Sequence, residues 1–208
     1  MQGMDKLIII RHMLSVIGES GLSDASSLHP SVITANGVLD TTDFDLQSKG
    51  WWFNTERQLT LVQDSDGKVT LPGNTLSFSL SNVHNLAPAE KVRYSKRGNR
   101  LYDTFKHSDV IGHPITVDIT VRLSVEDLPS VAFNYVMHDA AYNMYVNDDG
   151  DNFKTDKLFN RRVEAWQRLY AEHLKVTAAN ALDNPTARRL RMAGAGSHRS
   201  PNTVGSYR

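Results

Sequence analysis

The sequence predicts an α+β fold in which helical segments at both ends enclose a β-rich segment. Up to Gly50, apolar residues recur at the spacing of a helix, and between about 55 and 125 they alternate as in strands. After Pro129 the helical spacing returns. Helix–helix, sheet, helix–helix is an α+β order. We therefore expect an antiparallel four-helix bundle with a β-rich lobe inserted between its second and third helices.

Two helices are predicted before Gly50, over 5–17 and 30–49. The apolar stripe of the first consists of Leu7, Ile10, Leu14 and Ile17, and Gly18 follows as a natural C-cap. Pro30 suits the first position of the second helix. Its stripe consists of Val32, Ala35, Leu39 and Leu46. Gly37 interrupts this helix and costs about 1 kcal/mol relative to Ala.

An aromatic cluster follows the second helix. Gly50 allows the chain to turn, and Trp51, Trp52 and Phe53 come directly after it. Each ring buries on the order of 150–250 Å² when it is enclosed. We expect these rings to enter the seam between bundle and lobe and to fix the angle between them, although a plain core role is an equally good interpretation.

The lobe, residues 55–125, begins with a predicted hairpin. Strand 58–62 precedes the turn Asp64–Gly67, and strand 68–72 follows it. Further strands are predicted at 75–80, 91–95, 100–105 and 115–123. The last alternates clearly, which predicts one buried and one solvated face. Its apolar face consists of Ile115, Val117, Ile119, Val121 and Leu123.

Two more helices are predicted over 129–146 and 155–181. In the last helix we expect an inward stripe of Phe159, Val163, Trp166, Tyr170 and Leu174. Residues 1–182 then form a single domain. Residues 183–208 contain five Arg and one Asp among Gly, Ser, Pro and Asn, so we expect a flexible basic tail.

Composition excludes several classes of protein. The 208 residues are 40% hydrophobic and 22% charged, as in a globular protein, and 23 basic residues balance 23 acidic ones. Without Cys there are no disulfides, thiolate metal sites or Cys nucleophiles. No apolar run reaches the roughly 20 residues of a membrane span, and the start lacks a secretory signal, so we expect a soluble, non-secreted product.

Motifs of catalysis are weak. Asp148, Asp149 and Asp151 surround Gly150, but an EF-hand register would place Tyr145 at the first ligand position, so a turn is the better interpretation. The eight His form no HExxH pattern, and there is no GxSxG, P-loop or GxGxxG. Carboxylate pairs for glycoside hydrolysis are conceivable without being indicated. The candidates are Asp43, Asp45, Glu56, Glu126, Asp127 and Asp139.

An ordered set of segments resembles a known family. Val16–Glu19 (VIGE) ends the first helix and His29-Pro30 opens the second. Gln47–Glu56 (QSKGWWFNTE) leads into LTLVQDSDGKVTLPGN, and Lys96–Ser108 (KRGNRLYDTFKHS) follows. In that order, over about 1–182, the chain resembles the tail tubular protein A family of short-tailed phages, the head-to-tail adaptors.

The resemblance implies a structural virion protein of the tail, made in the host cytoplasm, without catalytic activity or cofactor. It implies a twelve-subunit ring between the portal and the tail nozzle protein (tail tubular protein B type) that lines the channel for double-stranded DNA. One Trp of the cluster could then face a neighbouring subunit. Two alternatives stay open: a tail-associated hydrolase of host polysaccharide, and a DNA-binding protein that acts through its basic tail.

The tail itself suggests a partner site. Arg188, Arg189 and Arg191 can form charge-assisted pairs with carboxylates, while Leu190 and Met192 fill small apolar pockets. We expect the tail to become ordered along an acidic surface of the portal, at an ordering cost of about 2–5 kcal/mol.

Overall fold

The computed structural model describes residues 4–19, 29–81, 93–147 and 152–182, with side chains at 153–177 in the last range. The chain divides into two compact units, 1–169 and 170–208, and the last helix runs across their boundary. All the described strands and three of the described helices lie in the first unit.

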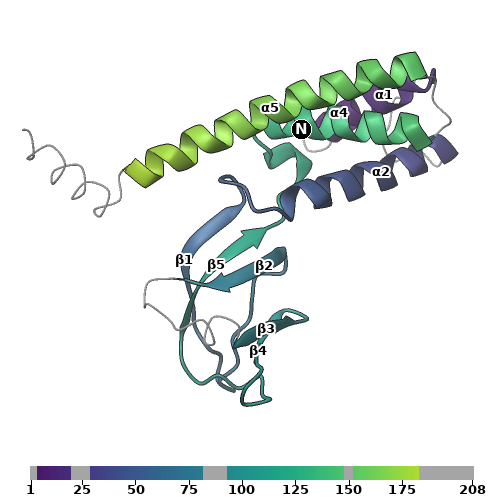
Figure 1. Cartoon of the computed structure of the whole chain (residues 1–208). Coiled ribbons are helices and arrows are strands. Elements are labelled where there is room, and N and C mark those ends of the chain that lie inside the picture. Colours follow the sequence, from purple (N-terminus) through teal and green to yellow (C-terminus); the bar gives the residue numbers. More distant parts are fainter. Residues whose placement is uncertain (1–3, 20–28, 82–92, 148–151, 183–208) are drawn as a thin grey trace, which may run out of the picture. The chain divides into compact units, whose positions relative to one another are not determined.

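The four predicted helices are confirmed (Figure 1). They are α1 (Met4–Val16), α2 (Pro30–Gln47), α4 (Ser130–Asn147) and α5 (Asn152–Leu182), and a 3₁₀ turn, η2 (Val125–Asp127), precedes α4. Gly18 ends α1 with φ +90°, as its C-cap position requires. The start of α2 lies beside the end of α1, where the Ser31 hydroxyl donates to the Glu19 carboxylate at 2.7 Å.

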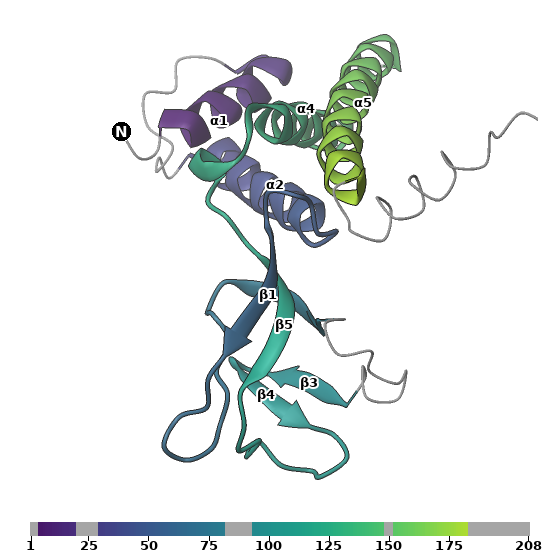
Figure 2. The same cartoon turned by 90° about the vertical axis from the view of Figure 1, so that its left-hand side faces the viewer.

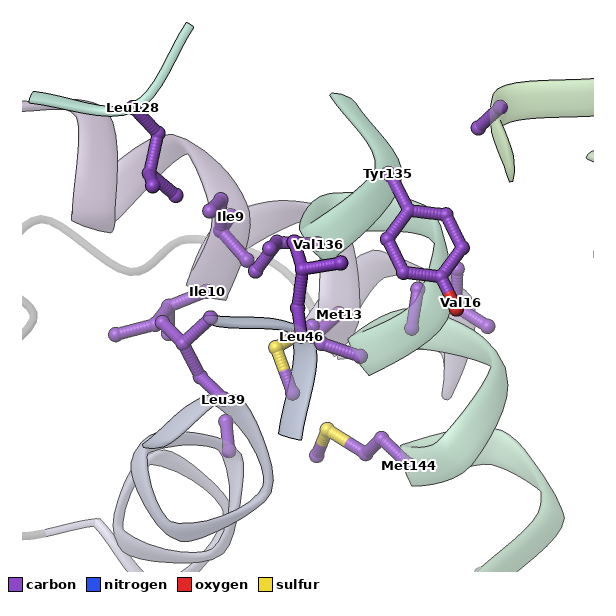
Figure 3. Packing of buried hydrophobic residues seen from close by; sticks show 14 of the residues in the cluster. Ile9, Ile10, Met13, Val16, Leu39, Leu46, Leu128, Tyr135, Val136 and Met144 are labelled. Atoms are coloured by element: carbon purple, nitrogen blue, oxygen red, sulfur yellow. The ribbon is translucent and has the colours of Figure 1, made fainter. Parts of the chain in front are cut away.

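The helices share one hydrophobic core. Ile9, Ile10 and Met13 of α1 are fully buried against Leu39 and Leu46 of α2 and against α4 (Figure 3). The buried residues of α4 include Val136, Ala140, Ala141 and Met144, which recur at the spacing of one helix face. This packing, rather than helix propensity, stabilises α2 around Gly37.

The inward stripe expected for α5 is right only in part, because Trp166 is partly buried on the helical core but three other members are exposed. Its buried residues are Leu158, Ala165 and Leu169, whereas Phe159, Tyr170 and Leu174 are 46%, 47% and 48% exposed. Apolar residues occur on two adjacent faces of this helix, so the periodicity fits either face. Leu158, Ala165 and Leu169 recur at intervals of seven and four residues, which places them on one face of the helix.

The described residues of the lobe form two antiparallel sheets. Strands β1 (Thr55–Leu61) and β2 (Thr75–Leu80) flank β5 (Ile115–Val121) in the order β1-β5-β2. Strands β3 (Tyr94–Arg97) and β4 (Arg100–Asp103) form the second sheet (Figure 2). The alternation predicted for β5 is confirmed. Its buried members are Ile115, Val117, Ile119 and Val121, and they centre a second hydrophobic core.

The predicted pairing of 58–62 with 68–72 is wrong. The Asp64–Gly67 turn forms, but only the single bridge Gln63↔Val69 joins its two arms. Strand β1 pairs with β5 instead. Val69 and Leu71 are buried in the sheet core, where Leu101 N–H donates to Val69 O at 3.0 Å and Leu71 N–H donates to Asn99 O at 2.8 Å. Burial of these apolar residues beside β4 therefore outweighs the local hairpin.

Several predictions fall outside the described residues. The acidic turn 148–151, part of the strand expected at 91–95, and the tail 183–208 with Arg188, Arg189, Leu190, Arg191 and Met192 lie there. The single-domain boundary at 182 stays a prediction. Of the described helices, none is both long enough and apolar enough to span a bilayer.

Candidate functional site at the helix–sheet junction

The turn from α2 into β1 depends on a glycine. Gly50 has φ +72°, and a Cβ built there would lie 3.2 Å from Thr120 Oγ1. Both the left-handed backbone and this close approach favour glycine. The turn then directs Trp51 back toward the helices.

Trp51 is anchored at three points. It is 5% exposed, its indole N–H donates to Leu46 O at 2.7 Å, and its backbone N–H donates to the Asn54 side chain at 2.7 Å. Its ring meets Trp166 of α5 edge-to-face, with 5.4 Å between centroids. The Lys49 ammonium lies 4.8 Å from the centroid of the Trp166 ring.

Trp52 and Phe53 are partly buried on the same helical core, and their rings contact Trp51 at 6.3 and 6.4 Å between centroids. These three aromatic rings therefore pack on the helical core, and none of them belongs to the hydrophobic cluster of the sheets. Whether the cluster fixes the angle between bundle and lobe stays a prediction.

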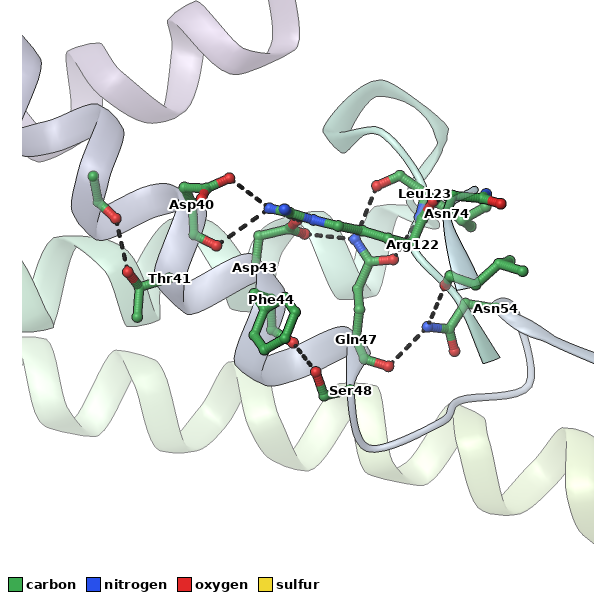
Figure 4. Close-up of polar contacts among 12 residues, drawn as sticks. Asp40, Thr41, Asp43, Phe44, Gln47, Ser48, Asn54, Asn74, Arg122 and Leu123 are labelled. Atoms are coloured by element: carbon green, nitrogen blue, oxygen red, sulfur yellow. Dashed lines mark hydrogen bonds and ion pairs between the residues drawn. The ribbon is translucent and has the colours of Figure 1, made fainter. Parts of the chain in front are cut away.

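A buried polar network joins α2 to the end of β5 (Figure 4). Gln47 is fully buried. Its amide nitrogen donates to Asp43 at 2.7 Å and to Leu123 O at 3.0 Å, while its amide oxygen accepts from Leu123 N–H at 2.8 Å. The side chain therefore pairs with the backbone of Leu123 as a neighbouring strand would. All the polar atoms of this amide have partners, as burial requires.

Asn54 provides the second connection. It is 1% exposed, and its amide nitrogen donates to Gln47 O at 2.9 Å and to Val121 O at 3.0 Å. The backbone continues the link, since Val121 N–H donates to Asn54 O at 2.9 Å. One amide thus ties the end of α2, the aromatic turn and β5 together.

Arg122 forms the outer edge of the network. Its guanidinium donates to Asp43 at 3.1 and 3.2 Å and to Asp40 at 2.6 Å. Burial by itself would lower the pKa of Arg122, but the hydrogen bonds and negative charges of Asp40 and Asp43 outweigh it and raise that pKa. The buried Asp43 carboxylate, 2% exposed, therefore has a permanent countercharge.

A hollow of about 500 Å³ lies beside this network. Its lining includes Lys6, Asp40, Asp43, Phe44, Arg122 and Glu126. Two of the three carboxylates are held in ion pairs with Arg122. Of the other carboxylates considered for hydrolysis, Asp139 lies 2.7 Å from Arg162 Nε, and Asp127 accepts from the Ser124 hydroxyl at 2.7 Å. Asp43, Asp127 and Asp139 are thus engaged in structural contacts.

Metal binding has no support in the part of the chain that the structure describes, where no group of three or more His, Asp or Glu could hold an ion. Two of the histidines instead form a pair in the bundle. His12 of α1 and His138 of α4 contact edge-to-face, with 5.5 Å between centroids. Burial is the main cause that lowers the pKa of each.

Sequence reasoning missed Gln47, Asn54 and Arg122. One signal was available: Asp43 and Gln47 are polar residues at i and i+4 on the face that Leu39 and Leu46 mark as buried. Polar side chains at such positions indicate a buried hydrogen-bond network. Their partners at the end of β5 are 76 or more residues away, which no local pattern specifies.

In the described geometry, polar residues at the junction join the helices to the β-rich lobe. In comparison with known proteins, a family model described as "Tail tubular protein" matches residues 7–173. The chain belongs to this family of structural proteins of the phage tail. A relative, tail tubular protein A of Klebsiella phage KP34, is 28% identical over 191 residues, which cover 91% of this chain and 98% of that protein.

Proposed function

We propose that the chain acts as a tail tubular protein A, a head-to-tail adaptor that forms a twelve-subunit ring between portal and tail nozzle and lines the DNA channel. The observation that carries the proposal is the family match over 7–173, which includes most of α1, the whole β-rich lobe and α4. The near-complete coverage of the KP34 relative supports it.

The junction gives the proposal a physical basis. In a closed ring, each subunit repeats the same angular error, so the two lobes of a subunit must keep a fixed angle. Gln47, Asn54 and Arg122 connect α2 to β5 through hydrogen bonds that are buried or partly buried. A satisfied buried network of this kind specifies one arrangement more strictly than apolar contact alone.

Mass measurement of the chain mixed with its portal protein tests the ring. We expect a complex with twelve copies of the chain, whether the chain alone is a monomer or a ring. If the chain binds no portal under any assembly condition, the adaptor proposal is wrong. An assay of polysaccharide hydrolysis on the same preparation tests the enzyme alternative.

A further inference from the structure

The β3–β4 ribbon, residues 94–103 with their immediate flanks, is strongly basic. Between residues 93 and 106 five side chains are basic and only Asp103 is acidic, in a chain whose formal charge is zero. The two strands pair antiparallel through a two-residue turn, in which Gly98 has φ +59°. The register of the ribbon decides where each charge points.

On the inner face of the ribbon, where Leu101 is buried, the charged side chains make structural contacts. Lys96 lies opposite the fully buried Leu101, and its ammonium donates to Thr75 O of β2. Arg93 donates to the buried Asp103 carboxylate at 2.7 and 2.9 Å. This hydrogen bond is the main cause that lowers the pKa of Asp103 to about 2.

The outer face is different. Arg97 lies directly opposite Arg100, and like charges in that position destabilise a strand pair. The Arg97 guanidinium stacks on Tyr102, 3.4 Å from the ring centroid. Arg100 is half exposed and lies 3.6 Å from Asp109, which Lys68 already holds at 2.9 Å. The fold therefore sets Arg97 and Arg100 directly opposite each other, and Asp109, which also pairs with Lys68, lies near Arg100.

We propose that the outer face of the ribbon, formed by Ser95, Arg97, Arg100 and Tyr102, binds phosphate groups of duplex DNA without reading its base sequence. Guanidinium groups match phosphate oxygens in geometry, and stacking on Tyr102 orients Arg97 before it binds. A two-stranded ribbon also fits the major groove of B-DNA. The choice of DNA as the partner rests on the proposed function, in which DNA passes through the ring.

Two-dimensional NMR of the ¹⁵N-labelled chain tests this contact with a short DNA duplex of random sequence at low salt. We expect shifts of amide signals concentrated in residues 95–102. In Arg97→Gln/Arg100→Gln these shifts disappear and affinity falls roughly tenfold, and the slope of log K against log salt decreases by about 1.8, or about 0.9 for each phosphate contact. The matched control, Arg161→Gln/Arg168→Gln, removes two exposed arginines from α5 and keeps the parent slope.

The inference is overturned by no duplex binding of the parent chain, by shifts outside the ribbon, or by an equal effect of both double variants. A poly-glutamate peptide that produces the same shifts at the same affinity would assign the ribbon to an acidic protein instead. The mass measurement with portal keeps the two proposals separate. If the variant forms the ring normally and the parent binds no duplex, only the DNA contact is refuted and the adaptor proposal stands.

Discussion

The Gln47 side chain and the Leu123 backbone form two hydrogen bonds, of 2.8 and 3.0 Å, across 76 residues of sequence. The side-chain amide of Gln47 thereby bonds both backbone polar groups of Leu123, as the backbone of a neighbouring strand would. The pair is a direct polar link between the helices and the lobe.

Replacement of Gln47 tests this link. In Gln47→Met the backbone N–H and C=O of Leu123 lose their partners at similar side-chain volume. We expect the free energy of unfolding to fall by about 2–4 kcal/mol, because each buried unsatisfied group costs about 1–3 kcal/mol. Urea unfolding measures it. Ser48→Ala, one residue further on and exposed, should stay within about 0.5 kcal/mol of the parent, and equal effects of both changes would refute the link.

Trp51 should contribute more to stability than its aromatic neighbours. Trp51→Ala leaves a large cavity in the helical core and should cost about 3–5 kcal/mol. Trp52→Ala and Phe53→Ala should cost less, since both rings are only partly buried. Thermal unfolding of the three variants gives the order. A Trp52→Ala variant that keeps its stability but no longer assembles with portal would place that ring against a neighbouring subunit.

Two glycines should respond in opposite ways to alanine. Gly50→Ala should destabilise the fold by about 1–2 kcal/mol, because φ is +72° and Thr120 leaves little room for a Cβ. Gly37→Ala should stabilise it by about 0.5–1 kcal/mol, because Gly37 lies in α2 with nothing within 4 Å of an added Cβ. Chemical denaturation of both variants is the measurement, and loss of stability in Gly37→Ala would show that this position serves a tighter contact.

The His12–His138 pair predicts how stability changes with pH. Burial lowers the pKa of both histidines in the folded state, and the positive charge of Arg161 lowers both pKa values further. Arg168 also lowers the pKa of His138, whereas the negative charge of Glu164 raises it. The unfolded chain then binds protons more readily. Stability should be complete above about pH 6.5 and decrease as the pH falls below it, by about 1.4 kcal/mol for each unit of pKa difference.

The double variant His12→Gln/His138→Gln should show a weaker dependence of unfolding free energy on pH between about 7.5 and 5.5 than the parent. If the double variant follows the parent curve, other groups control the pH response.

Deletion of residues 184–208 tests the basic tail. We expect unchanged unfolding of the remaining chain and weaker attachment to portal, because the deletion removes the pairs that we predict between Arg188, Arg189 and Arg191 and its carboxylates. Co-sedimentation with portal compares the truncated and full chains. Equal attachment would mean that the tail has no part in docking.

The sequence by itself determined the order and type of the elements. Periodicity specified four helices and the buried face of β5, because these patterns depend on residues close together in the chain. The same local view explains its failures. Apolar residues on two faces of α5 left its inward side ambiguous, and the Asp64–Gly67 turn suggested a hairpin that the lobe does not form.

Only the tertiary structure decided which strands pair and what joins the two lobes. Val69 and Leu71 lie beside β4 because the sheet core buries them there. Gln47 and Asn54 find their partners at the end of β5, where burial makes each unsatisfied polar atom costly and so specifies one arrangement. Arg97 and Arg100 form one surface only because the register of β3 and β4 sets them directly opposite each other.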